Sequence, residues 1–456
     1  MLSKVFLDAT ELKRLDPNGR LQTTFNQRFM GPEHHEQLSP LFKEDPASVL
    51  QRYIKRFHQP NARHQAIIDY DVEMSAKYGR QGGSYKVEVL EENILESYTL
   101  ADRHLVANKT LALGRDILLS LIKLRKAQEA PLAISPEWFI KNTAGGFPDR
   151  QRKNCWLSHV ECRAHWQTLL PDLPGARRQR SKDRIIHEDA TVNVDYIQST
   201  LKAVKGWLVN QFPDFFTAWR NPEQGLYQLV TKHLRRGHPA LETDYYHMDT
   251  HVSLWLVEEY LLPIYEALLD PADFLHFSSY VYQAFHQPIF MGNAIWTGLH
   301  NLFSGQGITN DFETLLSLIL YLGASFKVTK RIPELAMVGD DVITWQESLK
   351  QLLRIRDEVY QVTDDVGLEL SKEKERLTKE AYRFCRQVYY PALPLNYDAQ
   401  GQPFVRPAYP PVLALNNLIQ PETVKSPRVE LAADMFRLDN TVGFYRYRDF
   451  LDFVFP

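Results

Sequence analysis

The clearest candidate for chemistry is the run VGDDV at residues 338–342, where two adjacent carboxylates lie between apolar residues. Glycine supplies the positive φ of a tight turn, so the flanking runs Leu335–Val338 and Val342–Trp345 predict the strands of a hairpin. Neighbouring carboxylates repel each other and raise each other's pKa unless a cation lies between them. A hard divalent ion would relieve that repulsion, although Asp and Gly are also ordinary residues of a solvated turn.

Two further carboxylates occur upstream in the run DYYHMD, which contains Asp244 and Asp249. A strand that ends at Asp244 would place this carboxylate at the edge of a sheet. Asp249 precedes a helical pattern, so capping of that helix is the simpler alternative for its role. His247 and His251 lie in the same run, but ions such as Mg²⁺ prefer oxygen. We therefore expect these two histidines to make packing or polar contacts.

Between these two runs lies a loop of small and polar residues, FSGQGITN, at positions 303–310. Such a loop can bring backbone N–H groups and hydroxyls close to a ligand. Asp311 and Glu313 follow in the first turn of a predicted helix, where the helix dipole favours acids. The apolar stripe that predicts this helix comprises Phe312, Leu315, Leu316, Ile319 and Leu322.

The remaining pattern is mostly helical. Apolar residues recur at helical spacing in the segments Asn93–Lys126, Asp195–Asn210, Val252–Leu268 and Glu430–Arg437. Together with the few strand-like runs, this predicts an α+β fold that is predominantly helical and contains a small antiparallel sheet.

Composition narrows the class of protein. The 456 residues are 44% hydrophobic and 24% charged, as in a soluble globular protein, and no run of 18 apolar residues predicts a membrane span. The N-terminal segment reaches Asp8 too early for a secretory signal. Three cysteines without C-x-x-C spacing favour a reducing compartment and argue against zinc.

The net charge is −3, yet residues 150–184 hold nine Lys and Arg against three acids, which suits a channel for phosphates.

The order of these runs carries more information than any one of them. D-x4-D, then S-G-x3-T-N before a helix, then G-D-D between apolar strands resembles motifs A, B and C of viral RNA-dependent RNA polymerases. The run NTAGGFP at 142–148 resembles motif G, and the basic run at 177–184 resembles motif F. GLELSKEK at 367–374 resembles motif D, and 384–390 resembles motif E more loosely. The form of motifs G and B is most similar to that of picobirnaviruses, with partitiviruses as the second choice.

The resemblance implies a right-hand polymerase with fingers, palm and thumb, and a small antiparallel palm sheet. Its expected divisions are an N-terminal extension with fingertips at 1–140, fingers at 141–238, a palm at 239–390 and a thumb or C-terminal region at 391–456. A fingers segment at about 262–297 would be inserted in the palm.

For catalysis, the resemblance implies two Mg²⁺ ions, or Mn²⁺ in their place, held by Asp244, Asp340 and Asp341. A motif D lysine would protonate the leaving pyrophosphate, and both Lys372 and Lys374 are candidates.

For binding, the resemblance implies nucleotide and template sites. The triphosphate would be bound by Arg180, Lys182 and Arg184, and template entry would follow Asn142, Thr143, Ala144, Gly145 and Gly146. The nucleotide pocket would also contain Ser304 and Gly305 beside the templating nucleotide. Asp249 with Thr309 and Asn310 would recognise the ribose 2′-OH. Many relatives carry an asparagine four residues after the threonine, whereas this chain has Glu313.

The implied partners are an RNA template and product, nucleoside triphosphates and a viral capsid protein, without a membrane, in the virion interior and the host cytoplasm. Two other readings stay open. A reverse transcriptase would share motif C but usually has a bulky aromatic residue at the position of Asp249. A non-catalytic, capsid-associated RNA-binding protein would share only the fold.

Overall fold

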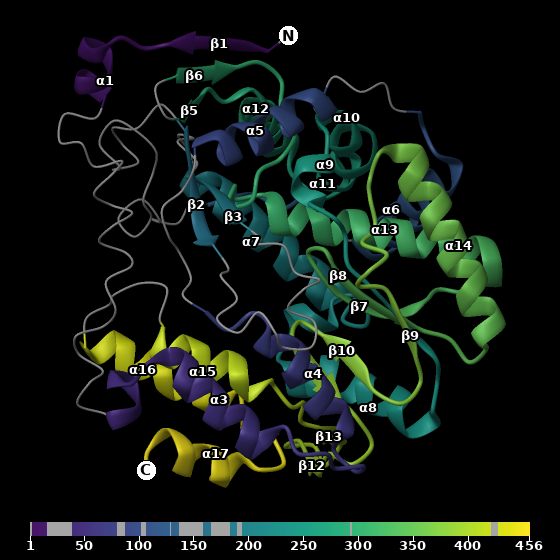
Figure 1. The fold of residues 1–456 in the computed structure, drawn as a ribbon. Helices are drawn as coiled ribbons and strands as arrows, with labels where there is room; N and C mark the ends of the chain where they lie inside the picture. The colour runs from purple at the N-terminus through teal and green to yellow at the C-terminus, as the bar shows by residue number, and fades with distance from the viewer. Residues whose placement is uncertain are drawn as a thin grey trace. The chain divides into compact units, whose positions relative to one another are not determined.

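The structure is a computed structural model that describes residues 2–15, 39–79, 87–101, 106–127, 129–135, 158–165, 183–188, 194–291, 294–420 and 427–456. The chain forms two compact units (Figure 1). The first comprises Met1–Pro17, Val87–Glu161 and Ile186–Lys379, and the second comprises Asn18–Lys86, Cys162–Ile185 and Glu380–Pro456.

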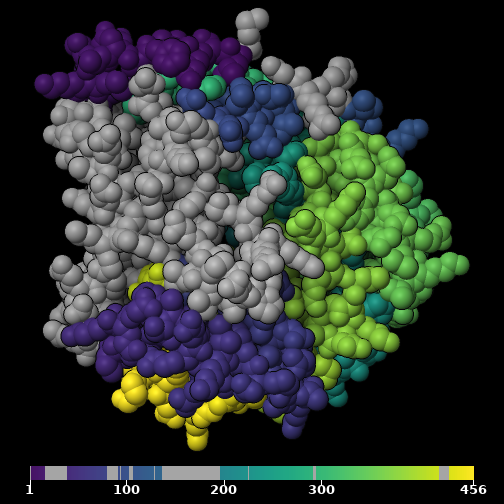
Figure 2. Space-filling model, viewed as in Figure 1, coloured from purple at the N-terminus to yellow at the C-terminus, as the bar shows by residue number. Residues whose placement is uncertain are grey.

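The first unit contains a four-stranded sheet and most of the helices. Its longer helices are α1 (Ala9–Leu15), α5 (Val87–Ala101), α6 (Lys109–Lys126), α7 (Val194–Gln211), α8 (Leu226–Arg236), α11 (Leu262–Leu268), α12 (Pro271–His286), α13 (Thr309–Thr329) and α14 (Leu349–Val366). Its short turns are η5 (Thr217–Trp219), η6 (Pro222–Gln224), α9 (Met248–His251), α10 (Leu254–Leu256) and the π-helical turn η7 (Val257–Leu261). In space-filling form, the outer faces of α1 and α14 lie at the surface (Figure 2).

The sheet that carries the acidic motifs has four antiparallel strands in the order β7-β8-β4-β9. Its strands are β4 (Ala240–Thr243), β7 (Glu334–Val338), β8 (Asp341–Trp345) and β9 (Arg376–Thr378). β4 is buried along its whole length. It pairs with β8 on one side, with Thr243 opposite Val342, and with β9 on the other.

Helix α13 runs through the centre of the first unit and crosses α6 at very short range. A Cβ atom added to Gly114 of α6 would lie 1.7 Å from the carbonyl oxygen of Ile319, and one added to Gly323 of α13 would lie 2.0 Å from that of Thr110. Only glycine allows the two backbones to approach so closely. Most residues of α13 are buried, so this helix is the core element that carries the loop of residues 303–310 at its N-terminus.

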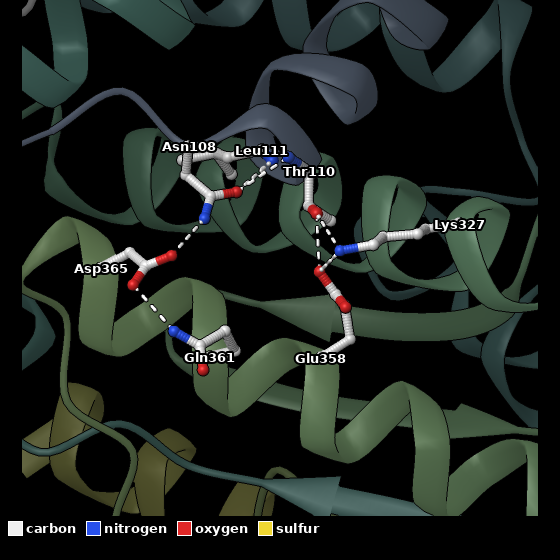
Figure 3. A network of polar contacts seen from close by, with 7 residues as sticks. All are labelled: Asn108, Thr110, Leu111, Lys327, Glu358, Gln361 and Asp365. Atoms are coloured by element: carbon white, nitrogen blue, oxygen red, sulfur yellow. Dashed lines mark hydrogen bonds and ion pairs between the residues drawn. The ribbon is translucent and has the colours of Figure 1, made fainter.

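Polar side chains fix the other end of this crossing (Figure 3). Lys327 of α13 donates to Glu358 of α14 at 2.6 Å and to Thr110 of α6 at 3.2 Å, and Thr110 also donates to Glu358 at 2.6 Å. Asn108 caps α6 through the backbone N–H of Thr110 and donates to Asp365 of α14. Three helices are therefore locked together by side chains that satisfy one another.

The second sheet has the order β1-β6-β5-β2-β3. Its strands are β1 (Ser3–Phe6), β2 (Ser158–His165), β3 (Asp183–Glu188), β5 (Ile289–Met291) and β6 (Ala294–Thr297). The N-terminal strand β1 is antiparallel to β6, with Ser3 opposite Thr297.

The second unit packs helices around a buried carboxylate. Asp71 accepts hydrogen bonds from Tyr53 at 2.7 Å and from the backbone N–H of Val412 at 3.0 Å, and it pairs with His58 at 2.9 Å. These three contacts explain why an acid is tolerated in that core. The unit's elements are η2 (Pro40–Lys43), α3 (Pro46–Phe57), α4 (Gln65–Ser75), β10 (Tyr382–Phe384), β11 (Gln387–Tyr389), β12 (Leu395–Tyr397), β13 (Pro403–Val405), α15 (Pro411–Ile419), α16 (Pro427–Asp439) and α17 (Tyr447–Val454).

Most of the elements predicted from the sequence are present in the structure. The predicted hairpin and the helices at Asp195–Asn210, after Gly305 and near Glu430–Arg437 are confirmed as β7–β8, α7, α13 and α16. The helical pattern of Asn93–Lys126 is also confirmed, and it is divided between α5 and α6, which Asn108 caps. The segment Val252–Leu268 is also interrupted, by a π-helical turn before Pro263.

Within the described residues, α13 is the one helix whose length and composition would suffice to cross a membrane. Of its apolar window, 78% is buried inside the protein, so the apolar character is accounted for by its central position in the core.

Candidate active site

The hairpin and β4 bring the acidic motifs together. Thr243 pairs with Val342 in antiparallel strands, so Asp244 and Asp341 follow this pair at the same end of β4 and β8. Gly339 occupies the turn with φ +57° and donates its backbone N–H to Thr314 of α13 at 2.7 Å. The GDD turn is therefore fixed to α13, the helix that follows the loop of residues 303–310, here called the Ser–Gly loop.

A hydrogen bond to its backbone and an ion pair to its side chain fix the position of Asp244. Its carbonyl oxygen accepts from the N–H of Ser371, and Lys374 lies on the turn that begins there, because its own N–H donates to the Ser371 carbonyl at 3.0 Å. The Lys374 ammonium forms an ion pair with Oδ2 of Asp244. Oδ1 of Asp244 is buried and has no hydrogen-bond partner, so one oxygen of this carboxylate is available to a ligand.

Asp340 lies in a field of like charges. Burial raises the pKa of its carboxyl, and Asp244 and Asp249 raise it further, while its own backbone N–H and Lys374 act in the opposite direction. A group in this position favours any cation that approaches it.

Hydrogen bonds of its own residues stabilise the Ser–Gly loop. Gln306 accepts from the N–H of Phe303 at 3.0 Å and donates to the carbonyl of Ala284 at 2.9 Å. The Thr309 hydroxyl donates to the Phe303 carbonyl at 2.9 Å, which closes the loop at its base. Gly305 is exposed and has φ +100°, a conformation that favours glycine.

The first turn of α13 presents two polar side chains toward the GDD turn. A Cβ atom added to Gly339 would lie 3.1 Å from Nδ2 of Asn310 and 3.3 Å from Oε2 of Glu313. Burial raises the pKa of the Glu313 carboxyl well above its usual value, and the carboxylates of Asp340 and Asp249 raise it further. Glu313 thus retains a proton more readily than an exposed glutamate and can donate, as an amide does.

The run between Asp244 and Asp249 contains a strained residue. His247 has φ +45° and ψ +54°, a left-handed conformation that costs a non-glycine residue roughly 1–2 kcal/mol. Its ring stacks on Tyr246 with centroids 4.3 Å apart, and its Nδ1 lies 3.8 Å from Oε2 of Glu96 in α5. His251 is buried, with Nδ1 2.9 Å from the carbonyl oxygen of His247.

The structure describes only some of the other residues singled out from the sequence. The ammonium of Lys372 lies 5.9 Å from the ring centroid of Tyr360. Arg184 belongs to β3, of which only the backbone is described. The remaining candidates lie outside the described residues: Asn142, Thr143, Ala144, Gly145, Gly146, Arg180 and Lys182.

The donor set fits a hard divalent cation in chemical type. Asp244 offers a buried carboxylate oxygen without a partner, and Asp340 and Asp341 supply oxygens from the adjoining turn. Among the described residues, no three His, Cys, Asp or Glu side chains converge closely enough to enclose an ion as they stand. Lys374 holds one oxygen of Asp244, so metal binding would require that contact to open.

Comparison with known proteins gives a fold-level result. No protein-family model and no curated protein matches the sequence. Among solved structures, the RNA-dependent RNA polymerase of a human picobirnavirus matches with a TM-score of 0.74, 15% identity and coverage of 99% of this chain and 89% of that one. Its insertion-loop deletion mutant matches with a TM-score of 0.74, 16% identity and coverage of 99% and 92%.

The chain has the right-hand fold of a viral RNA-dependent RNA polymerase. Both the predicted fold class and the resemblance to picobirnavirus polymerases are therefore confirmed at the level of fold. In that fold the four-stranded sheet β7-β8-β4-β9 corresponds to the small palm sheet expected from the sequence.

Proposed function

We propose that this protein is an RNA-directed RNA polymerase, which transfers nucleotides from NTPs to an RNA 3′-OH under the direction of a template. The observation that carries the proposal is the pairing of Thr243 with Val342, because Asp244 and Asp341 follow this pair at the GDD end of the two strands. A polymerase fold with decayed function would have no reason to keep Asp244 and Asp249 near enough to raise the pKa of Asp340, because such repulsion destabilises the fold.

In this proposal Asp244 and Asp340 hold two Mg²⁺ ions, with Asp341 supporting one of them. The ions would lower the pKa of the primer 3′-OH and neutralise the triphosphate and the leaving pyrophosphate. Asp244 offers its unpartnered Oδ1 at once and Oδ2 after Lys374 withdraws.

Lys374 is the preferred acid for the leaving pyrophosphate. Of the two motif D candidates, it is the one whose ammonium contacts a catalytic carboxylate, and it is 47% exposed, so it can leave Asp244 without unfolding its turn. Release from Asp244 on metal binding would free this ammonium to donate a proton near the same centre.

We assign recognition of the ribose 2′-OH to Asp249, Asn310 and Glu313. The Thr309 hydroxyl donates its hydrogen within the loop, so Asn310, whose side chain is exposed, is the better candidate for direct contact. Glu313 takes the place where many relatives have asparagine, and burial together with the Asp340 and Asp249 carboxylates raises the pKa of its carboxyl. An acid at Asp249 in place of a bulky aromatic residue leaves room for the 2′-OH.

The remaining roles rest on the resemblance alone. Arg180, Lys182 and Arg184 would bind the triphosphate through guanidinium and ammonium donors. Asn142–Gly146 would guide the template, Ser304 and Gly305 would lie against the templating nucleotide, and base choice would come from pairing with the template. The partners would be a double-stranded RNA genome and a capsid protein, in the virion interior and host cytoplasm without a membrane.

Primer extension tests this proposal. The protein is supplied with Mg²⁺ and either NTPs or dNTPs on matched RNA and DNA templates. The proposal predicts extension with NTPs on RNA. Extension with dNTPs would indicate a reverse transcriptase, and RNA binding without any extension would indicate a non-catalytic protein on the same fold.

A further inference from the structure

Helix α5 lies far from the catalytic motifs in sequence, yet three consecutive side chains of this helix contact the segments around them. Glu96 faces His247, between the two motif A aspartates, at 3.8 Å. The hydroxyl of Ser97 donates to the carbonyl of Asn301, just before the Ser–Gly loop, at 3.3 Å. Tyr98 lies edge-on to His300, with ring centroids 5.3 Å apart.

These contacts converge on the segment that carries Asp249. Asn301 donates its side-chain amide to the carbonyl of Thr250 at 2.8 Å. Thr250 in turn donates its hydroxyl to the carbonyl of His247 at 2.9 Å and its backbone N–H to Oδ1 of Asp249 at 2.9 Å. The position of the Asp249 carboxylate therefore depends on the backbone of residues 247–250. Helix α5 contacts this segment at His247 and is linked to Thr250 through Asn301.

The left-handed backbone conformation of His247 is energetically unfavourable, so contacts with neighbouring residues must stabilise it. The contacts that hold its imidazole are the stacked ring of Tyr246 and the carboxylate of Glu96. The same imidazole lowers the pKa of Glu96, and His251 adds a smaller effect, which is the expected signature of a charge facing the two histidines.

We propose that Glu96 and His247 form a clasp through which α5 sets the position of Asp249, so that Glu96 is a positioning residue for nucleotide selection. The inference rests on the proposed function, since selection between ribose and deoxyribose has meaning only for a polymerase. Glu96 does not contact the nucleotide. It acts through His247 and the turn α9, which begins at the next residue.

The test compares E96A with E92A. Glu92 lies one turn earlier on the same helix and is exposed, so its loss controls for the removal of an acid from α5. E96A should raise the KM for NTPs and lower the NTP-to-dNTP ratio of kcat/KM by about tenfold, the size expected when a charged contact is lost. E92A should match the wild type. E96Q, which keeps a polar side chain of the same shape, should recover part of the discrimination.

A second variant separates positioning from folding. H247G removes the imidazole at a position where glycine adopts the required φ freely, so the protein should fold at least as well as the wild type. It should nevertheless lose discrimination as E96A does, and the double variant should be no worse than either single one, because both break one contact.

The outcomes are distinct. If the wild type extends no primer, the proposed function fails. If the wild type extends primers but E96A and H247G keep its discrimination, or if their effects simply add, the clasp is refuted. Equal losses of kcat and of thermal stability without any change in discrimination would also refute it, because they would indicate a merely structural contact.

Discussion

The crossing of α6 and α13 makes a strong prediction about Gly114. In G114A the new methyl group would begin 1.7 Å from the Ile319 carbonyl oxygen and 2.9 Å from the N of Gly323. Because ordinary contacts of carbon lie near 3.5 Å, the two helices would have to separate locally by about 1.5 Å or more. Both neighbours are backbone atoms, so no side-chain rotation can relieve the contact.

Two opposing effects determine how much G114A changes the free energy of unfolding. Overpacking a tight core costs about 3 kcal/mol at the upper end of its usual range. Replacing glycine by alanine within a helix returns about 0.5–1 kcal/mol. We therefore expect G114A to lower the free energy of unfolding by about 2 kcal/mol. Incorporation should also fall, because α13 carries the Ser–Gly loop and pins the GDD turn through Thr314.

Gly206 in α7 supplies a matched control, since a Cβ atom there meets nothing within 4 Å. G206A should stabilise the protein by about 0.5–1 kcal/mol, the helix-propensity gain alone. Urea unfolding followed by tryptophan fluorescence measures both variants, and primer extension measures activity. If G114A is as stable as G206A, the reasoning from the close approach of α6 and α13 is refuted.

Three further predictions follow from the site and its surroundings. K374M should slow single-turnover incorporation by roughly 10²-fold, while K372M should stay within about threefold of the wild type, and equal losses would contradict the assignment of the acid. E313Q should keep nucleotide discrimination, because its amide donates as a protonated carboxyl does, whereas E313A should lose it in competitive NTP and dNTP assays. Burial lowers the pKa of His233 to about 3, so the folded state excludes a proton that the unfolded state binds below the ordinary histidine pKa of 6.5. Stability should therefore fall by about 1.5 kcal/mol between pH 6.5 and pH 5 and less in H233F, as urea midpoints at several pH values would show.

Much of the palm could be predicted because its signals are local. The GDD turn needs a glycine with positive φ between two apolar runs. Apolar residues at helical spacing predict α13. Asp244 could be placed at a strand end, but its register with Asp341 could not, because strand pairing depends on contacts remote in sequence.

Other features had no sequence signal that could be interpreted in isolation. Asn108 within a long helical pattern gave the only local hint that α5 and α6 are separate, since asparagine favours helix N-caps. The Gly114–Gly323 crossing and the contact between Glu96 and His247 join residues from distant segments, so only the fold could show them. The departure at Glu313 was visible, but its burial and raised pKa were not.

The most direct test of the central proposal is single-nucleotide incorporation by the wild type and by D340N on a primed RNA template with Mg²⁺. Asn keeps the size of the side chain but removes the charge that would hold a metal ion. The wild type should add the NTP that pairs with the template, and D340N should add none while binding the same RNA with similar affinity. Full incorporation by D340N, or none by the wild type, would contradict the proposed polymerase.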